Sequence, residues 1–284
     1  MKILIIGLGS IAKKHINALY KSIDGVIIDA LRSNPHSESY LGVNNVYKLN
    51  KDYDLIIIST PSVNHLDDIK KLVNYNKRVP IMVEKPFLIN KTQIEEFNKL
   101  EFQSPLYIAC NLRHIDSFKQ FTYSVLKDKS KINEVTSYCG SYLPDWRPTQ
   151  DYTKSYSANN KLGGGVNLDL IHEFDLLYHI LGKPNEVIKR NRKYSTLNIN
   201  SFDYSHYTLD YGDFDATVKL NYFRKDYKRY IEIVKESKTY YYEFNKDEIS
   251  NSYIEQIKYV IKNINKSNYM NNPNEALEVL NMVL

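Results

Sequence analysis

Short apolar runs alternate with amphipathic segments through the first 110 residues, and this alternation constrains the fold more than any other feature. Continuously apolar strands between helices are typical of a parallel sheet that is covered on both faces. We therefore expect a doubly wound α/β domain. The expected strands are Lys2–Ile6, Val26–Leu31, Asp54–Thr60, Ile81–Val83 and Leu106–Cys110, and the expected helices are Ala12–Leu19, Leu66–Asn74 and Thr92–Leu100.

The pattern changes in the second half of the chain. Several segments there alternate polar and apolar residues, which is typical of an antiparallel sheet with one covered face and one open face. The expected strands are Asn133–Leu143, Glu186–Tyr194, Ser205–Leu209, Phe214–Phe223, Tyr230–Lys235 and Thr239–Phe244, with helices at Val166–Leu181 and Ser252–Ile264. We expect two domains: an α/β domain at 1–114 and an α+β domain with a large, mostly antiparallel sheet at 115–284.

Composition narrows the class of protein. Hydrophobic residues make up 43% of the 284 residues, enough for packed cores. The two cysteines, Cys110 and Cys139, cannot form a disulfide framework and fit a reducing compartment. The apolar start at Met1–Ile6 is too short for a signal peptide, and no apolar run approaches the ~18 residues of a membrane helix. We expect a soluble, cytoplasmic protein with no membrane partner.

The net charge of +5 suits anionic small molecules, but it is too small and too scattered to indicate nucleic-acid binding. The densest basic stretch, Arg224–Arg229, interleaves tyrosine with charge. Such a stretch can bind a nucleic acid strand, but it is more typical of the solvated face and hairpin end of an antiparallel sheet.

A glycine-rich turn follows the first expected strand. Gly7 permits a tight turn, Gly9 lets a ligand approach the backbone, and Ala12 keeps the next helix close to the strand. The backbone amides at the helix start, near Ser10 and Ile11, would face phosphates. An ordinary strand-to-helix turn is the alternative, but the βαβ context favours a site for the pyrophosphate of a dinucleotide, as in a Rossmann domain.

The end of the second strand bears on the choice between NAD and NADP. Asp29 lies about twenty residues beyond the glycines, where an acid that binds the ribose would lie. If the strand instead ends at Leu31, Arg32 and Ser33 face a 2′-phosphate. We favour the second interpretation, and with it NADP, while NAD stays open.

Several segments then resemble one family. Ile58–His65 and Val83–Pro86 resemble two hallmark segments of the Gfo/Idh/MocA oxidoreductases, the relatives of glucose–fructose oxidoreductase and inositol dehydrogenase. Asn111–His114 is similar to the domain junction of that family, Gly163–Gly182 to its catalytic helix, and Glu275–Leu280 to its last helix. The resemblance implies a nicotinamide-dependent reaction on a sugar. Together with an upstream Asp-Trp-Arg-Pro step, the catalytic-helix segment looks most like members linked to bacterial surface-sugar biosynthesis.

Lys85 is the first candidate for proton transfer. Oxidising a secondary alcohol requires a base that takes the hydroxyl proton, and a lysine can serve when burial or a nearby cation lowers its pKa. Lys85 ends an apolar strand at the carboxyl edge of the expected sheet, where ligands collect. Pro86 would stiffen the backbone there, and Glu84 could accept a hydrogen bond. A solvated strand-end lysine is the alternative, but the resemblance favours the catalytic role.

Asp169, His172 and Asp175 are spaced three apart on the expected helix, so His172 can contact either acid. By itself this is also the pattern of a histidine at the edge of a packed helix. The resemblance implies that His172 is an acid/base or a hydroxyl anchor, that Asp169 is catalytic, and that one acid orients the imidazole. The family usually separates the two by four residues around a glycine, which this chain lacks.

The remaining candidates are weaker. His65 could line the nicotinamide site or cap the helix that follows it. The candidate cofactor contacts beyond the glycine turn and the second strand are Thr60, Pro61, His65 and Glu84. The candidate substrate contacts are Arg113, Tyr142, Arg147, Tyr156 and Asp175, of which Arg147 could pair with a carboxylate or a phosphate.

No metal site is expected, because the seven histidines and two cysteines lack metal-binding spacings. The sequence thus predicts an NAD(P)-dependent oxidoreductase that interconverts a secondary alcohol and a ketone on a sugar, including nucleotide-linked or phosphate-linked sugars. The alternatives are a non-catalytic dinucleotide sensor on the same fold and a redox-neutral elimination or hydrolysis that uses the nicotinamide transiently. Relatives imply a homodimer or homotetramer formed through the second-half sheet.

Overall fold

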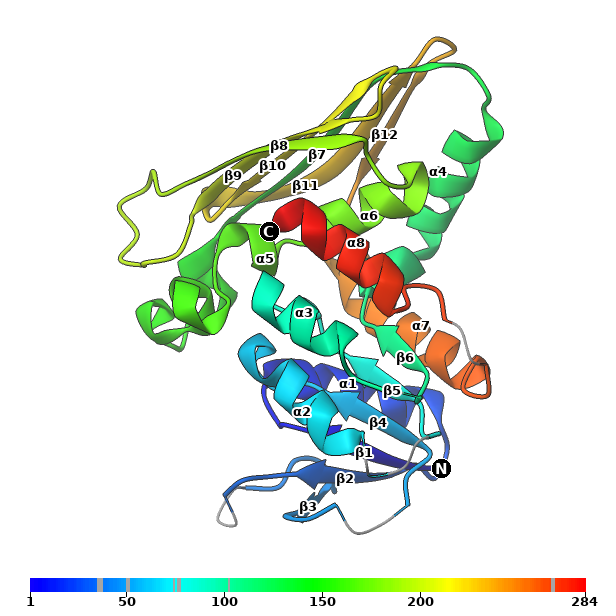
Figure 1. Ribbon diagram of the computed structural model, residues 1–284, viewed down its shortest axis with the longest axis vertical. Coiled ribbons are helices and arrows are strands. Elements are labelled where there is room, and N and C mark those ends of the chain that lie inside the picture. The colour runs from blue at the N-terminus through cyan, green and yellow to red at the C-terminus, as the bar shows by residue number, and fades with distance from the viewer. Residues whose placement is uncertain (35–37, 50–51, 74, 76–77, 102, 267–268) are drawn as a thin grey trace. The chain divides into compact units, whose positions relative to one another are not determined.

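A computed structural model describes residues 1–34, 38–49, 52–73, 75, 78–101, 103–266 and 269–284 (Figure 1). The chain divides into two compact units. The first unit contains Met1–Asn111 and Asn251–Leu277, and the second contains Leu112–Ser250 and Glu278–Leu284. The expectation of two consecutive domains, 1–114 and 115–284, did not include the return of 251–277 to the first unit. This segment belongs to the first unit because its apolar side chains pack there: Ile257 and Val260 are fully buried in the core of that unit.

The first unit contains a parallel sheet in the order β3-β2-β1-β4-β5-β6. The strands are β1 (Lys2–Ile6), β2 (Ile27–Leu31), β3 (Asn44–Val46), β4 (Leu55–Ile58), β5 (Ile81–Val83) and β6 (Leu106–Ile108). The helices are α1 (Ser10–Ser22), α2 (His65–Leu72) and α3 (Lys91–Asn98), with a 3-10 turn at Ser62–Asn64. A further 3-10 turn, Asn111–His114, spans the boundary between the two units. The expected doubly wound sheet is therefore confirmed. The short β3 was not expected because it is polar, and Asn74, the expected end of α2, lies outside the described residues.

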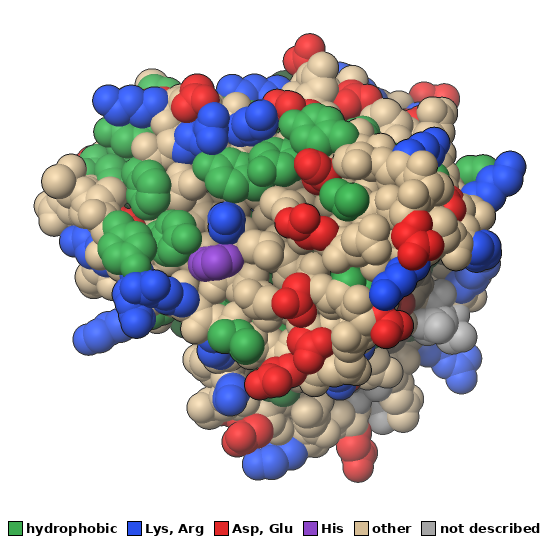
Figure 2. Space-filling model, turned by 90° about the horizontal axis from the view of Figure 1, so that it is seen from above, with side chains coloured by type: hydrophobic (Ala, Val, Ile, Leu, Met, Phe, Trp, Pro, Cys, Tyr) green, Lys and Arg blue, Asp and Glu red, His purple; other side chains and the backbone are tan. Residues whose placement is uncertain are grey.

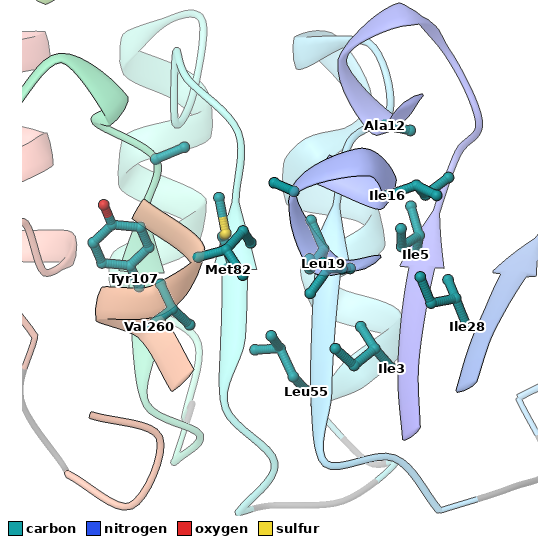
Figure 3. Close-up of a cluster of buried hydrophobic side chains, with 14 of the residues drawn as sticks. Ile3, Ile5, Ala12, Ile16, Leu19, Ile28, Leu55, Met82, Tyr107 and Val260 are labelled. Atoms are coloured by element: carbon teal, nitrogen blue, oxygen red, sulfur yellow. The ribbon is translucent and has the colours of Figure 1, made fainter. Parts of the chain in front are cut away.

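Apolar side chains on both sides of this sheet explain why the first unit folds as it does. Ile3 and Ile5 of β1 and Leu55 of β4 contact Ile16 and Leu19 of α1 in one buried cluster (Figure 3). Further along the same face, the cluster contains Met82, Tyr107 and Val260, which come from β5, β6 and α7 (Lys246–Lys262). Helix α1 and the later turns of α7 thus cover one face of the sheet.

The second unit contains a sheet in the order β12-β11-β7-β10-β9-β8. Only the β7–β10 pair of these described strands is parallel, so the expected mostly antiparallel sheet is confirmed. The strands are β7 (Ile132–Tyr142), β8 (Glu186–Arg192), β9 (Tyr204–Asp210), β10 (Asp215–Asn221), β11 (Phe223–Lys235) and β12 (Thr239–Glu243). The other elements are α4 (Asp116–Lys127), α5 (Val166–Asp169), α6 (His172–Leu181) and 3-10 turns at Leu143–Trp146, Tyr152–Lys154, Tyr156–Ala158 and Asn160–Leu162. Helix α8 (Pro273–Val283) begins in the first unit, and its residues from Glu278 on belong to the second. Helix α4 was not expected from the sequence.

One face of this second sheet packs on helices α4 and α6 (Figure 1). On β9, for example, Tyr207 is fully buried and its ring lies edge-on to Phe174 of α6, 4.7 Å between centroids. The opposite face carries partly exposed aromatic side chains. The rings of Tyr138, Tyr230 and Tyr241 stack in a row with 5.5 Å between successive centroids. Figure 2 shows hydrophobic side chains, tyrosine included, gathered beside lysine and arginine on the upper surface of the molecule.

No helix among the described residues is long and apolar enough to span a membrane.

Candidate active site

The glycine turn is fixed by close backbone packing. Gly7 has a φ of +87°, and a Cβ added there would lie 3.0 Å from Thr60 Cγ2 and 3.1 Å from the Thr60 nitrogen. The Ser59 hydroxyl donates to the carbonyls of Ile6 and Gly7, at 3.1 and 3.3 Å. A Cβ added at Gly9 would have no described atom within 4 Å. Gly7 is thus required by the fold, whereas Gly9 leaves an open approach to the backbone, as a bound pyrophosphate needs.

A groove of about 660 Å³ opens beside this turn, within the first unit. Its size suits part of an extended dinucleotide. Among the described residues, no side chain caps the α1 N-terminus at Gly9, so the first turn of the helix presents its dipole toward a phosphate. The groove is lined by Ile6, Gly7, Leu8, Leu31, Arg32, Ser33, Tyr47, Thr60, Pro61, Asn64, Asp67, Asp68 and Lys71. Five of the expected cofactor contacts, Gly7, Arg32, Ser33, Thr60 and Pro61, line it.

Asp29, the acid considered for the ribose, binds side chains of the protein instead. Its side chain is buried and accepts hydrogen bonds from the Tyr53 hydroxyl at 2.9 Å and from the Asn44 amide at 3.2 Å. Burial, together with the neighbouring Asp29 carboxylate, raises the pKa of Tyr53. Arg32 and Ser33, in contrast, line the groove.

Lys85 follows β5 in the same unit and is held by its neighbours. The Glu84 backbone N–H donates to the Ile58 carbonyl at 3.0 Å, which extends the parallel pairing of β4 and β5, and the Lys85–Pro86 peptide bond is cis. The Glu84 side chain is buried. One of its oxygens lies 2.5 Å from His15 Nε2, and the other accepts the Lys85 backbone N–H at 3.2 Å. Burial acts to raise the pKa of Glu84, but His15 and the nearby cations hold it below its usual value.

His65, the first residue of α2, is fully buried and does not line the described part of the groove. Its Nδ1 lies 3.0 Å from the Pro86 carbonyl and 3.2 Å from the Phe87 carbonyl, and its Nε2 lies 3.0 Å from the Thr60 carbonyl. Burial lowers the pKa of His65. The imidazole therefore joins the segment after β4 to the segment after Lys85.

The expected continuous helix Val166–Leu181 is wrong. Helix α5 ends at Asp169 and α6 begins at His172, because Leu170 has a ψ of +34°. Asp169 and His172 are therefore not three apart on one helix, as expected, whereas His172 and Asp175 both lie on α6. Asp169 and His172 are both buried, at 1% and 8% exposure.

The Asp169 carboxylate accepts a hydrogen bond from the Tyr222 hydroxyl, next to the end of β10. Its charge also acts on Tyr156, which lies in a 3-10 turn. Burial and the Asp169 charge raise the pKa of each tyrosine well above its usual value. Asp169 thus connects α5 to the sheet.

Two expected substrate contacts bind each other. Arg113 donates to Asp175 through Nε at 2.9 Å and through an amino group at 2.7 Å, and both side chains are buried. The remaining expected contacts, Tyr142 and Arg147, are partly exposed. The Arg147 guanidinium lies 6.0 Å from the Tyr156 ring centroid, and Lys225 Nζ lies 5.7 Å from the Tyr142 ring centroid.

Three side chains have contacts near the candidate residues that were not expected from the sequence. His15 and Tyr222 hold the candidate residues Glu84 and Asp169. The only sequence signal for His15 was its place on the helix after the glycine turn, and we found none for Tyr222. Arg229, expected on a solvated face, is buried in an ion pair with Glu173, the residue after His172, at 2.7 Å. The described residues contain no group of three or more His, Cys, Asp or Glu side chains that could hold a metal ion.

A two-unit chain with a dinucleotide-type turn and groove defines a class of nicotinamide-dependent enzymes, and comparison with protein families agrees. Residues 1–107 match the Gfo/Idh/MocA model described as an oxidoreductase family with an NAD-binding Rossmann fold. Residues 128–268 match the C-terminal α/β domain of the same family. The chain belongs to the Gfo/Idh/MocA oxidoreductase family.

Solved structures share the fold along the whole chain. Myo-inositol 2-dehydrogenase from Lactobacillus plantarum has a TM-score of 0.85 at 17% identity, covering 100% of this chain and 95% of its own. Scyllo-inositol dehydrogenase from Lactobacillus casei has a TM-score of 0.81 at 18% identity, with 98% and 92% covered. GenD2 from gentamicin A biosynthesis, in complex with NAD, has a TM-score of 0.82 at 14% identity, with 100% and 92% covered. At these identities the likeness shows the fold alone. A comparison with curated protein sequences gave no match.

Proposed function

We propose that this protein is an NAD(P)-dependent dehydrogenase or reductase that interconverts a secondary alcohol and a ketone on a sugar or a cyclic polyol. The observation that carries the proposal is the setting of Lys85. It follows β5 of the sheet that also carries the glycine turn, and three side-chain and backbone contacts hold the Glu84–Pro86 step. The polyol substrate class comes from the names of two structural neighbours, a myo-inositol and a scyllo-inositol dehydrogenase.

In the oxidative direction, Lys85 takes the proton of the reacting hydroxyl, and in reduction it returns a proton to the carbonyl oxygen. A nicotinamide dinucleotide whose pyrophosphate is held at Gly7 and Gly9 would supply the acceptor or donor of the hydride. His172 assists as a second proton-transfer group or as an anchor for a substrate hydroxyl. Asp169 helps to position His172: its carboxylate, bound by the Tyr222 hydroxyl, fixes the end of α5, three residues before His172.

For the cofactor we propose a preference for NADP over NAD. Arg32 and Ser33 line the groove at the end of β2, while the Asp29 carboxylate is bound to Tyr53 and Asn44. An arginine in that place suits the 2′-phosphate of NADP. Dissociation constants for NADPH and NADH from fluorescence titration test this. Arg32→Ala should weaken NADPH binding by about tenfold or more and leave NADH binding nearly unchanged. Tighter binding of NADH by the unaltered protein would refute the preference.

We also propose that the outer face of the second sheet joins copies of the chain into a dimer or tetramer. Partly exposed rings in the row Tyr138, Tyr230 and Tyr241 support this, because aromatic side chains are enriched at interfaces.

The test of the enzymatic role compares Lys85→Met with Lys91→Met, an exposed lysine of the same unit. Each full-length variant is titrated with NADPH and NADH and then assayed with myo-inositol, scyllo-inositol and a panel of sugar nucleotides. Lys85→Met should lower turnover by about 100-fold or more with little change in cofactor affinity, whereas Lys91→Met should behave as the parent. Full activity of Lys85→Met would overturn the proposal. Tight cofactor binding with no turnover of any probe would favour the non-catalytic or redox-neutral alternatives.

A further inference from the structure

A histidine that no step of the proposed reaction uses lies beside the candidate catalytic lysine. His15 is on α1, the helix that begins at the glycine turn, and its side chain is fully buried. Its Nε2 lies 2.5 Å from an oxygen of Glu84, which is 69 residues away in sequence. The contact therefore joins the dinucleotide helix to the residue before Lys85.

The direction of this hydrogen bond follows from the charge of the acid. The pKa of Glu84 is held below its usual value, so its carboxylate is ionised near neutral pH and can only accept. His15 Nε2 must then carry a proton and donate it. His15 Nδ1 is buried without a hydrogen-bond partner among the described residues. The contact from Nε2 to Glu84 is therefore the one hydrogen bond of the His15 side chain among the described residues.

Glu84, which His15 holds in place, also contacts the Lys85 backbone. Its second oxygen accepts the Lys85 backbone N–H, and its own backbone N–H bonds to the end of β4. The titratable groups around the Glu84 carboxylate are His15 from α1, Lys85 beside it and His65 from α2. Around the His15 ring lie Glu84 and, from α7, Tyr253, whose ring is edge-on at 5.8 Å and carries Lys14 Nζ over its face at 4.9 Å.

We infer that His15 is a positioning residue for Lys85. Its imidazole fixes the Glu84 carboxylate, and with it the Lys85 backbone, relative to the helix that begins at the dinucleotide turn. His15 touches neither substrate nor cofactor in this arrangement. For catalysis, the inference rests on the proposed role of Lys85 in proton transfer, but the contact itself can be tested without a substrate.

Two substitutions separate positioning from packing. In His15→Gln the side-chain amide nitrogen can reach the place of Nε2 and donate to Glu84, whereas His15→Leu fills the apolar space and donates nothing. If His15 only packs the core, the leucine variant should match or exceed the glutamine variant. If it positions Lys85, only the glutamine variant should retain the parental behaviour. Should His15→Leu fail to fold, His15→Asn replaces it, because its shorter amide cannot reach Glu84.

The first readout is trace acetylation of lysines by acetic anhydride on the full-length protein, followed by mass spectrometry, with Lys91 as the internal reference. Without the His15 donor, the Glu84 carboxylate can pair with the neighbouring Lys85 ammonium and shield it from the reagent. We expect acetylation of Lys85 at about pH 8 to slow by about threefold in His15→Leu and to stay at the parental rate in His15→Gln. Equal rates in the parent and both variants would overturn the inference.

The second readout is catalysis, measured with whichever probe of the polyol and sugar-nucleotide panel is turned over. We expect His15→Leu to lower kcat by about tenfold with little change in KM or in the NADPH dissociation constant, and His15→Gln to restore kcat. A fully active Lys85→Met would refute the proposed function, but the acetylation result would still test the contact between His15 and Glu84. An inactive Lys85→Met together with an unchanged kcat in His15→Leu would refute the role of His15 and leave the proposed function standing.

Discussion

Replacing Asp175 by asparagine should destabilise the second unit strongly, although both Asp175 and its partner Arg113 were first considered as substrate contacts. The Arg113 side chain is 1% exposed and the Asp175 side chain 8% exposed, and two of the arginine nitrogens bond the carboxylate at 2.9 and 2.7 Å. Removing one partner of such a pair leaves a buried charge uncompensated, which costs about 3–5 kcal/mol. An asparagine oxygen keeps one of the two bonds, so we expect a loss of about 3 kcal/mol in the free energy of unfolding.

Urea unfolding followed by tryptophan fluorescence measures this loss. Trp146 is the single tryptophan of the chain and lies in the second unit, where its ring is edge-on to Tyr222 at 5.4 Å, so its emission reports that unit. This matters because two units can unfold separately. The matched control is Asp116→Asn, which breaks the exposed ion pair of Asp116 with Lys119 and should cost less than about 1 kcal/mol.

A loss below about 1 kcal/mol in Asp175→Asn, or one no larger than that of the control, would refute the reasoning. The double variant Arg113→Met, Asp175→Leu provides a second check. Because it removes both charges and fills the space with apolar groups, it should be more stable than Asp175→Asn alone. Unchanged stability in Asp175→Asn together with a raised KM would indicate that Asp175 contacts the substrate.

Three further predictions concern the turn, the pH dependence and the sheet face. Gly9→Ala should fold as the parent but bind NADPH at least about tenfold more weakly. Gly7→Ala should also lose thermal stability, because Gly7 has a φ of +87°. Equal melting temperatures of the two variants would contradict this. Burial and neighbouring cations lower the pKa of His114 from 6.5 to about 3, so the unfolded chain binds the extra proton between these values. Stability should therefore fall with decreasing pH below about 6.5, by up to about 1 kcal/mol per pH unit, and urea midpoints at several pH values should show a flatter profile in His114→Asn. Sedimentation at micromolar concentration should show a dimer or tetramer that Tyr241→Lys combined with Tyr230→Lys shifts toward monomer, and a monomeric parent would contradict the proposed interface.

Local patterns in the sequence were sufficient for much of the fold. The continuously apolar β1, β4 and β5 and the glycine turn specify a parallel sheet with a dinucleotide-type crossover, because strand burial and turn geometry depend on neighbouring residues. The alternating strands of the second half likewise specified a sheet with one covered face. The Glu84–Pro86 step was located at the end of its strand for the same local reason.

Only the tertiary structure decided which polar side chains meet. Asp169 and Tyr222 are 53 positions apart, Arg113 and Asp175 are 62 apart, and His15 and Glu84 are 69 apart. No local periodicity encodes such pairings, because they depend on how separate elements pack and on the cost of burying a charge without a partner. The return of 251–277 to the first unit likewise depends on packing between distant segments, in this case of apolar side chains. The sequence alone therefore determined the two sheets and the dinucleotide turn. Packing decided which side chains form hydrogen bonds and ion pairs with the candidate residues.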